Sequence, residues 1–189
     1  MKDIVAKHHL RLLSLWDEHS SSGLPGFDRV PYFGQLPVSA RGSQLLFIGM
    51  NPSYVEGALG DLWKGAHEHN PVLTLLGAQA LEWKNFPQGH NRLERVDVIE
   101  TFDIYCREKY ERFYGPIRDL AIDAGVESDW QHLDLFPVRA TSQSSLLPHV
   151  GLGKDKSLAC AHPYRELLEA SFTLIAAMMP SVVLVTCND

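Results

Sequence analysis

Cysteine is scarce in this sequence. Only Cys106, Cys160 and Cys187 occur among 189 residues, and none of them forms a Cys-x-x-Cys pair. This spacing argues against a zinc ribbon or an iron–sulfur cluster, and it is typical of proteins from a reducing compartment. We therefore expect a cytoplasmic protein that needs no cofactor.

Long hydrophobic runs and an excess of positive charge are also missing. No segment is long and apolar enough to cross a membrane, and the first residues do not have the layout of a signal peptide. The 17 Lys and Arg residues stand against 23 Asp and Glu residues, which gives a net charge of -6. Nucleic-acid-binding proteins are usually basic because phosphate contacts dominate their affinity. The acidity counts against a broad nucleic-acid surface, although it is compatible with a local basic groove.

The hydrophobic content of 45% is ordinary for a globular protein, and the length fits one domain over residues 1–189. Residues 1–43 are predicted to form an N-terminal helix, from about Asp3 to His19, and an arm rich in Gly, Pro and Ser. We expect the arm to be ordered but without regular secondary structure.

Three short apolar segments predict strands, at Gln44–Ile48, His132–Val138 and residues 181–187. Helices are predicted between them: one after Asn70, one or two between Leu93 and Ala124 with a break at Gly115-Pro116, and one over Pro163–Met179. Residues 53–69, 84–91 and 139–153 are predicted to be loops. The alternation of strands and helices predicts a three-layer α/β/α fold whose central parallel sheet is covered on both faces. In such sheets ligands bind beyond the carboxyl ends of the strands.

The first predicted strand runs into the turn "GMNPSY" at residues 49–54. The segment "FIGMNPS" resembles the first motif of the uracil-DNA glycosylase superfamily, most closely in the Gly-Met-Asn-Pro branch of single-strand-selective and mismatch-specific enzymes. The resemblance implies a uracil-DNA glycosylase-like fold and a monofunctional hydrolase that removes a flipped uracil or other deaminated base from DNA. Asn51 would be the catalytic residue, with its side-chain carbonyl holding the attacking water. The alternative is that Asn51 only satisfies its own turn.

The resemblance also implies a set of residues that bind the base. Trp63, about a dozen residues beyond Asn51, stands where the family usually has a Phe that stacks on the base. Asp134, three residues before Pro137, stands where the single-strand-selective branch has an Asn that reads the base edge. An ionised Asp only accepts hydrogen bonds, so Asp134 would need an amino group or protonated ring nitrogen on the base, or would itself be protonated. The full expected set is Gly49, Met50, Pro52, Ser53, Tyr54, Trp63 and Asp134.

Two further groups of polar residues suggest possible sites. Arg139, Thr141 and Ser142 follow the second predicted strand and could contact DNA phosphates, although a solvated loop has the same composition. The triplet at residues 67–69, His-Glu-His, invites a zinc interpretation but lacks further ligands at a zinc-binding spacing, so we expect no metal. No Lys is placed for a Schiff-base mechanism.

One departure from the family keeps other functions open. The family's second catalytic motif, a His-Pro-Ser type of loop after a fourth strand, is absent from the 189 residues, so we expect the fold to lack its last strand and helix. The chain could therefore be a catalytically silent member that binds nucleic acid, a nucleobase or a protein partner. An unrelated nucleotide-dependent α/β enzyme is a third reading, but "GLGKDKS" at residues 151–157 lacks the spacing of a phosphate-binding loop.

Overall fold

The computed structural model describes residues 2–34, 45–50, 52, 56–70, 73, 82–86, 91–127, 129–139, 143–150, 160 and 162–186. Its elements are the helices α1 (Lys2–His19), α2 (Glu56–His69), α4 (Arg92–Lys109), α5 (Glu111–Asp123), α6 (Gln143–Val150) and α7 (Tyr164–Met178), the 3-10 turn η1 (Trp83–Asn85), and the strands β1 (Leu45–Gly49), β2 (Trp130–Asp134) and β3 (Val182–Val185). Within these ranges no helix has the length and apolarity that a membrane span requires.

The three strands form one parallel sheet in the order β2-β1-β3. Leu45 pairs with Trp130 on one side and with Val182 on the other. The predicted parallel sheet between helices is therefore confirmed, and the fold is of mixed α/β type. The central strand β1 is the first of the described strands in the sequence, and all five of its residues are buried.

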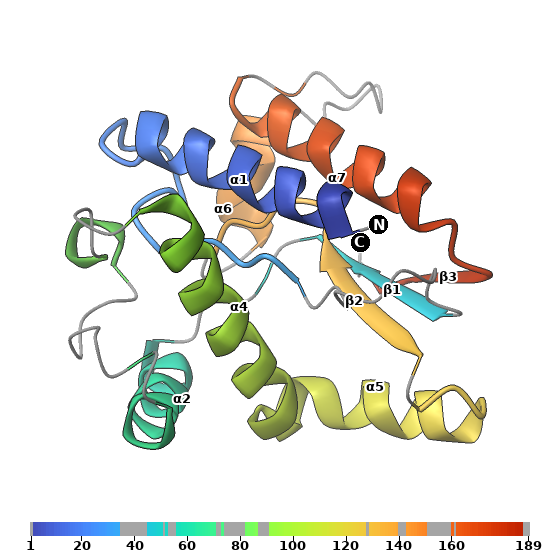
Figure 1. Cartoon of the computed structure of the whole chain (residues 1–189). Helices are drawn as coiled ribbons and strands as arrows, with labels where there is room; N and C mark the ends of the chain where they lie inside the picture. Colours follow the sequence, from blue (N-terminus) through green and yellow to red (C-terminus); the bar gives the residue numbers. More distant parts are fainter. Residues whose placement is uncertain are drawn as a thin grey trace.

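Alternate residues of β1 contact two different hydrophobic clusters. Leu45 and Phe47 belong to a large cluster that includes α4, whereas Leu46 and Ile48 pack with Leu174 and other residues of α7. Figure 1 shows the corresponding layers, with α1 and α7 on one face of the sheet and α4 and α5 on the other. Because the side chains of a strand alternate between faces, an entirely apolar strand needs cover on both sides, and β1 has it.

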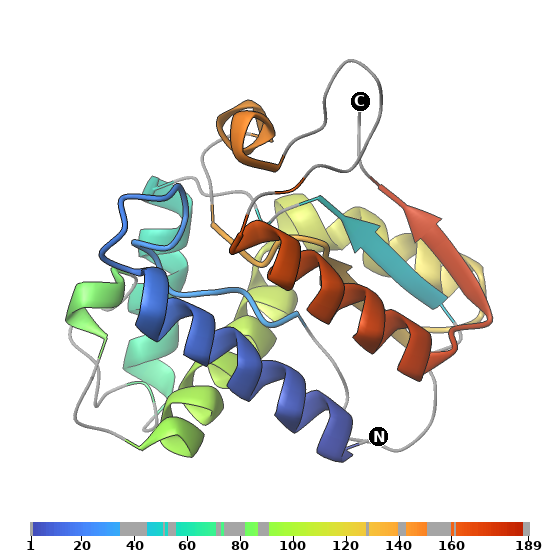
Figure 2. The same cartoon turned by 90° about the horizontal axis from the view of Figure 1, so that it is seen from above.

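The edge strand β3 does not have the same cover. Val182, Val183 and Val185 are 52%, 42% and 66% exposed, although their sequence is as apolar as that of β1. Figure 2 shows β3 at the outer edge of the sheet, beside β1. The prediction that the sheet is covered on both faces is therefore right for β1 and wrong for β3.

Helix α4 begins with a complete capping box. The Asn91 side chain accepts hydrogen bonds from the backbone N–H groups of Leu93 and Glu94, and the Glu94 side chain accepts one from the Asn91 N–H. The break between α4 and α5 comes at Tyr110, not at the predicted Gly115-Pro116. Tyr110 has φ -86° and ψ 71°, outside the helical region, while Pro116 lies inside α5.

Several predicted boundaries are corrected by the structure. Residues 56–69 form α2 and residues 143–150 form α6, where loops were predicted. The glycines of α2 and Pro148 of α6 weaken the helical signal in the sequence. Strand β2 begins at Trp130 and ends at Asp134, where a strand over His132–Val138 was predicted. The arm is ordered over residues 20–34 without a helix or strand, as predicted, and the helix predicted after Asn70 lies almost entirely outside the described residues.

Candidate functional site

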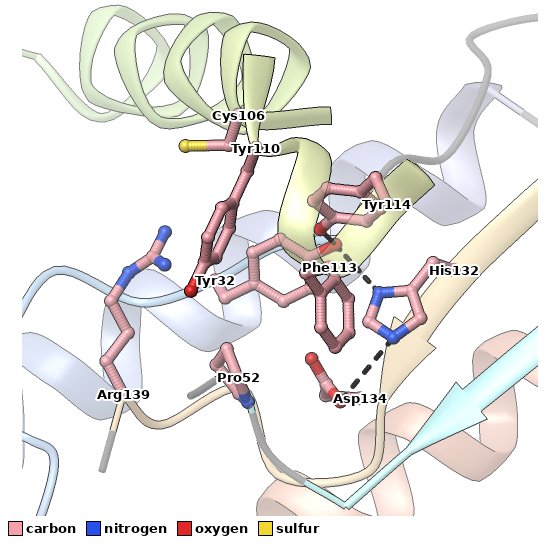
Figure 3. A pocket seen from close by; sticks show the side chains of 9 residues that line it. All are labelled: Tyr32, Pro52, Cys106, Tyr110, Phe113, Tyr114, His132, Asp134 and Arg139. Atoms are coloured by element: carbon pink, nitrogen blue, oxygen red, sulfur yellow. Dashed lines mark hydrogen bonds and ion pairs between the residues drawn. The ribbon is translucent and has the colours of Figure 1, made fainter. Parts of the chain in front are cut away.

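A small cavity lies beyond the carboxyl ends of β1 and β2, where an α/β sheet is expected to hold its ligand. Its volume is about 30 Å³, which is room for about one water molecule. Figure 3 shows that the surrounding side chains come from the two strand ends, from α4 and α5, and from the irregular segments at residues 32 and 139. The described residues that line it are Tyr32, Pro52, Cys106, Tyr110, Phe113, Tyr114, His132, Asp134 and Arg139.

Asp134 is the carboxylate that the sequence predicted at this edge. It is the last residue of β2 and is 2% exposed. Burial raises its pKa to about 8, with Arg139 opposing the shift and Asp103 adding to it. At pH 7 the carboxyl group is therefore mostly protonated, and it offers one O–H donor together with an acceptor oxygen. A protonated Asp134 presents the same donor and acceptor pair as the Asn that the resemblance leads us to expect there.

Gly49 leaves the space that the Asp134 carboxyl occupies. The two residues are partners across the β1–β2 pair, and a β-carbon built at Gly49 would lie 2.0 Å from Asp134 Oδ1. No side chain larger than hydrogen fits at this position while the carboxyl remains in place. The end of β1 is thus shaped around the carboxyl group of β2.

A chain of buried hydrogen bonds holds His132 beside Asp134. The Tyr32 hydroxyl lies 2.6 Å from the Tyr114 hydroxyl and 2.9 Å from His132 Nδ1. Burial, with a smaller effect from Arg107, lowers the pKa of His132 to about 3, so the imidazole is neutral at pH 7. Its Nε2 lies 3.8 Å from Asp134 Oδ1, too far for a hydrogen bond.

Two buried polar atoms beside the cavity are left without a hydrogen bond. They are His132 Nε2 and Asp134 Oδ2, neither of which has a partner among the described residues. Buried polar groups are nearly always hydrogen-bonded, to protein or to water. Both residues line the cavity, so a water or a polar ligand placed there could satisfy them.

Arg139 lies in the interior and not on an exposed loop. Its guanidinium donates to Asp103 Oδ1 at 2.9 Å and to the Val30 carbonyl at 3.1 Å, and Asp103 also accepts from the Phe33 N–H at 2.8 Å. Arg139 is 5% exposed and Asp103 is fully buried. A guanidinium held in this way is not available to DNA phosphates, so the predicted role does not fit its position. Burial raises the pKa of Asp103 to about 7 although Arg139 opposes the shift, so both buried carboxyls at this edge of the sheet have raised pKa values.

Trp63 also lies away from the cavity. It is 2% exposed, and its ring packs edge-on against Phe102 at 4.9 Å between α2 and α4. This position corresponds to a core aromatic, and the predicted stacking role does not fit it. Met50 is half-buried, and its carbonyl accepts the Phe136 N–H at 2.9 Å, so it extends the pairing between the two strands.

The structure therefore brings together only part of the predicted site. Pro52 and Asp134 line the cavity, and Gly49 adjoins it. The predicted residues Asn51, Ser53, Tyr54, Thr141 and Ser142 lie outside the described residues.

The sequence analysis missed the aromatic and imidazole lining of the cavity. His132 could have been found, because residues two apart on a strand face the same side and Asp134 was already a candidate. Tyr32, Phe113 and Tyr114 come from the arm and from α5, and no motif marks them.

A second and larger cavity lies between the segment that follows α1 and the 3-10 turn η1. It has a volume of about 360 Å³ and is lined by Ser20, Ser21, Asp28, Arg29, Glu82, Trp83 and Lys84. Its charged groups pair with one another: Glu82 contacts Lys84 at 2.9 Å and Arg29 at 3.6 Å. These charges neutralise each other, whereas the cavity beside Asp134 has buried polar atoms without a hydrogen bond to the described residues, so we take the cavity beside Asp134 as the candidate site.

Comparison with known protein families, with curated proteins and with solved structures found no match. The kinship suggested by "FIGMNPS" therefore stays a prediction that rests on the sequence motif.

Proposed function

We propose that the chain is a DNA glycosylase-like hydrolase that acts on deaminated bases. The observation that carries this proposal is the buried Asp134 carboxyl at the end of β2, beside a cavity at the carboxyl edge of a parallel sheet. Burial raises its pKa to about 8, which makes the carboxyl mostly neutral at pH 7. A neutral carboxyl can donate to a carbonyl and accept from an adjacent ring N–H. Uracil, hypoxanthine and xanthine all present an adjacent N–H and C=O pair of this kind.

In the proposed reaction the bond between the base nitrogen and the sugar C1′ breaks, and a water molecule adds to C1′. The base leaves with the bonding electrons, and the water proton passes to solvent or to the departing base. Negative charge develops on the base carbonyl, and a fixed O–H donor that faces this charge stabilises the transition state. Asp134 would supply that donor, and Asn51 would hold the water, as the motif implies.

The size of the cavity sets a condition on this mechanism. Space for one water is far below what a base needs, since small-molecule sites usually have 300 Å³ or more. A base could enter only if side chains in the wall turn outward. Tyr110 and Phe113 are the half-buried aromatic residues of that wall, and an outward-turned aromatic could then stack on the base.

The alternative function is a catalytically silent member of the same fold that binds nucleic acid, a nucleobase or a protein partner. Within this alternative, the narrow cavity and the net charge of -6 favour a protein partner, because both oppose entry of a flipped nucleotide. The two candidates differ in whether a base is released.

The test uses labelled oligonucleotides that carry uracil, hypoxanthine or xanthine, single-stranded and in duplex. After incubation, alkali cleaves abasic sites, and strand shortening is measured for the native chain and for Asn51→Ala. We expect cleavage of all three oligonucleotides by the native chain and none by the variant. Asp134→Asn should retain activity, because the amide keeps the donor and acceptor pair, whereas Asp134→Leu should lose it. A folded native chain that leaves every oligonucleotide intact would refute the hydrolase and favour the binding function.

A further inference from the structure

Three potential metal ligands meet where α1 ends and α7 begins. Glu18, His19 and His162 each offer a ligand atom, and these atoms all lie within 4.8 Å of one another. Glu18 and His19 are the last two residues of α1, and His162 lies two residues before α7. The neighbourhood is anchored by the core, since Tyr164 at the start of α7 donates a hydrogen bond to the Pro25 carbonyl at 2.9 Å.

The His19 imidazole is largely buried, with 14% of the side chain exposed. Its ring meets the Phe27 ring edge-on at 5.8 Å and the His162 ring at 4.8 Å. Its Nε2 is inaccessible to solvent, has no hydrogen-bond partner among the described residues, and lies 3.7 Å from Glu18 Oε1. A buried ring nitrogen without a partner calls for an explanation, and a bound ion is one of the few available.

His162 is oriented in the way that metal-binding histidines usually are. Its Nδ1 lies 2.7 Å from Glu166 Oε1. When the Nδ1–H group donates a hydrogen bond to that carboxylate, Nε2 keeps the lone pair that a metal requires. A carboxylate that fixes the tautomer of a ligand histidine in this way is a recurrent outer partner of zinc sites.

We infer that Glu18, His19 and His162 form a binding site for a divalent transition-metal ion, with Zn²⁺ as the best match. Two imidazoles and one carboxylate suit zinc, and such three-ligand sites leave a fourth position for water. Calcium and magnesium prefer oxygen ligands throughout. Glu18 and His162 have 66% and 53% exposed side chains, so they can close the remaining distance around an ion. This inference does not depend on the proposed glycosylase function.

A metal held here would tie the end of α1 to the start of α7. Because the ligands come from distant parts of the sequence, the site would assemble only in the folded chain, and ion binding would stabilise the fold by mass action. The sequence concealed the site, since it has none of the short spacings that mark a zinc motif.

The test is zinc binding by the full chain without a histidine tag, after removal of metal with a chelator. Competition with a chromophoric zinc indicator gives affinity and stoichiometry, and thermal unfolding with and without zinc gives the stabilisation. We expect one zinc ion per chain and a higher Tm with zinc. His162→Gln should weaken binding at least 100-fold and abolish the zinc-dependent rise in Tm. Glu166→Gln should weaken binding about tenfold through the orientation of His162.

The matched control is the double variant His67→Gln/His69→Gln, which removes the other candidate pair of histidines. It should bind zinc as the native chain does. His162 is half-exposed, so its substitution should leave the fold intact, and His19→Gln serves as the second ligand variant. Native zinc affinity in a folded His162→Gln chain, or loss of binding in the double variant, would place the ion elsewhere and overturn the inference. Failure of the native chain to bind zinc would overturn it as well.

Discussion

Replacing Asp134 with asparagine removes a titrating proton beside the cavity while it keeps the size of the side chain. In the unfolded chain this carboxyl titrates near its ordinary pKa of 3.8, whereas in the folded chain burial raises the pKa to about 8. Between these values the folded state binds a proton that the unfolded state has released, so the native chain loses stability as pH rises. Above pH 8 both states are ionised and the loss levels off. Asp134→Asn has no such proton.

The ratio of the unfolding equilibrium constant of the native chain to that of Asp134→Asn should therefore increase about tenfold per pH unit. Between pH 6.5 and 8 this amounts to about 2 kcal/mol in favour of the variant. Urea unfolding at constant ionic strength, at half-unit steps from pH 6.5 to 9, measures it. Asp119→Asn on the exposed surface of α5 is the control and should follow the native chain. Parallel pH profiles for native and Asp134→Asn would show that the buried carboxyl is ionised, and would refute the reasoning.

Three other predictions follow from the core. Gly49→Ala should lower the free energy of unfolding by about 1–3 kcal/mol or more, because its β-carbon would collide with a carboxyl oxygen across the strand pair; urea unfolding tests this, and a native-like stability would contradict it. Burial lowers the pKa of both His8 and His132 to about 3 from 6.5, so their share of the stability is complete above pH 6.5 and is lost as pH falls towards 3. Native stability should decline by about 2 kcal/mol per histidine by pH 5, and His8→Gln should remove one share of that decline. Leu46→Ala should cost about 2–5 kcal/mol, whereas Val183→Ala should cost less than about 1 kcal/mol; equal losses would mean that β3 is covered in solution.

The sequence was informative wherever local pattern and burial agree. The limits of the strands β1 and β3 and of the helix α7 were predicted to within one or two residues, because short apolar runs and a proline mark them. Helix α2 was missed, since its glycines disfavour helix, and the burial of Trp63 and Ala66 against the core offsets that. The exposure of β3 could not be predicted either, because an apolar composition shows that a strand can be buried but does not show which elements pack against it.

The position of the candidate site could be predicted from the sequence, but the contacts and protonation states of its residues could not. The rule for strand ends led to Asp134, and the local motif led to Pro52. Arg139 is buried because it pairs with Asp103, a carboxylate on another element. No local sequence pattern reveals that Asp103 lies there. The protonation of Asp134 likewise follows from the surrounding burial and from that neighbouring ion pair, both of which are properties of the tertiary structure.

The position of β1 in the sheet has a consequence for how the chain is made. Leu45 can pair on one side only after Trp130 has been synthesised, and on the other side only after Val182 has been synthesised. During synthesis the segment "LLFIG" leaves the ribosome long before its partners exist, and it is among the most apolar segments of the chain. Contacts between residues so distant in sequence form slowly, and an unpaired apolar strand is prone to aggregate in the meantime. We expect the nascent chain to be most vulnerable between the completion of β1 and the arrival of β2, the interval in which chaperones would have most to protect.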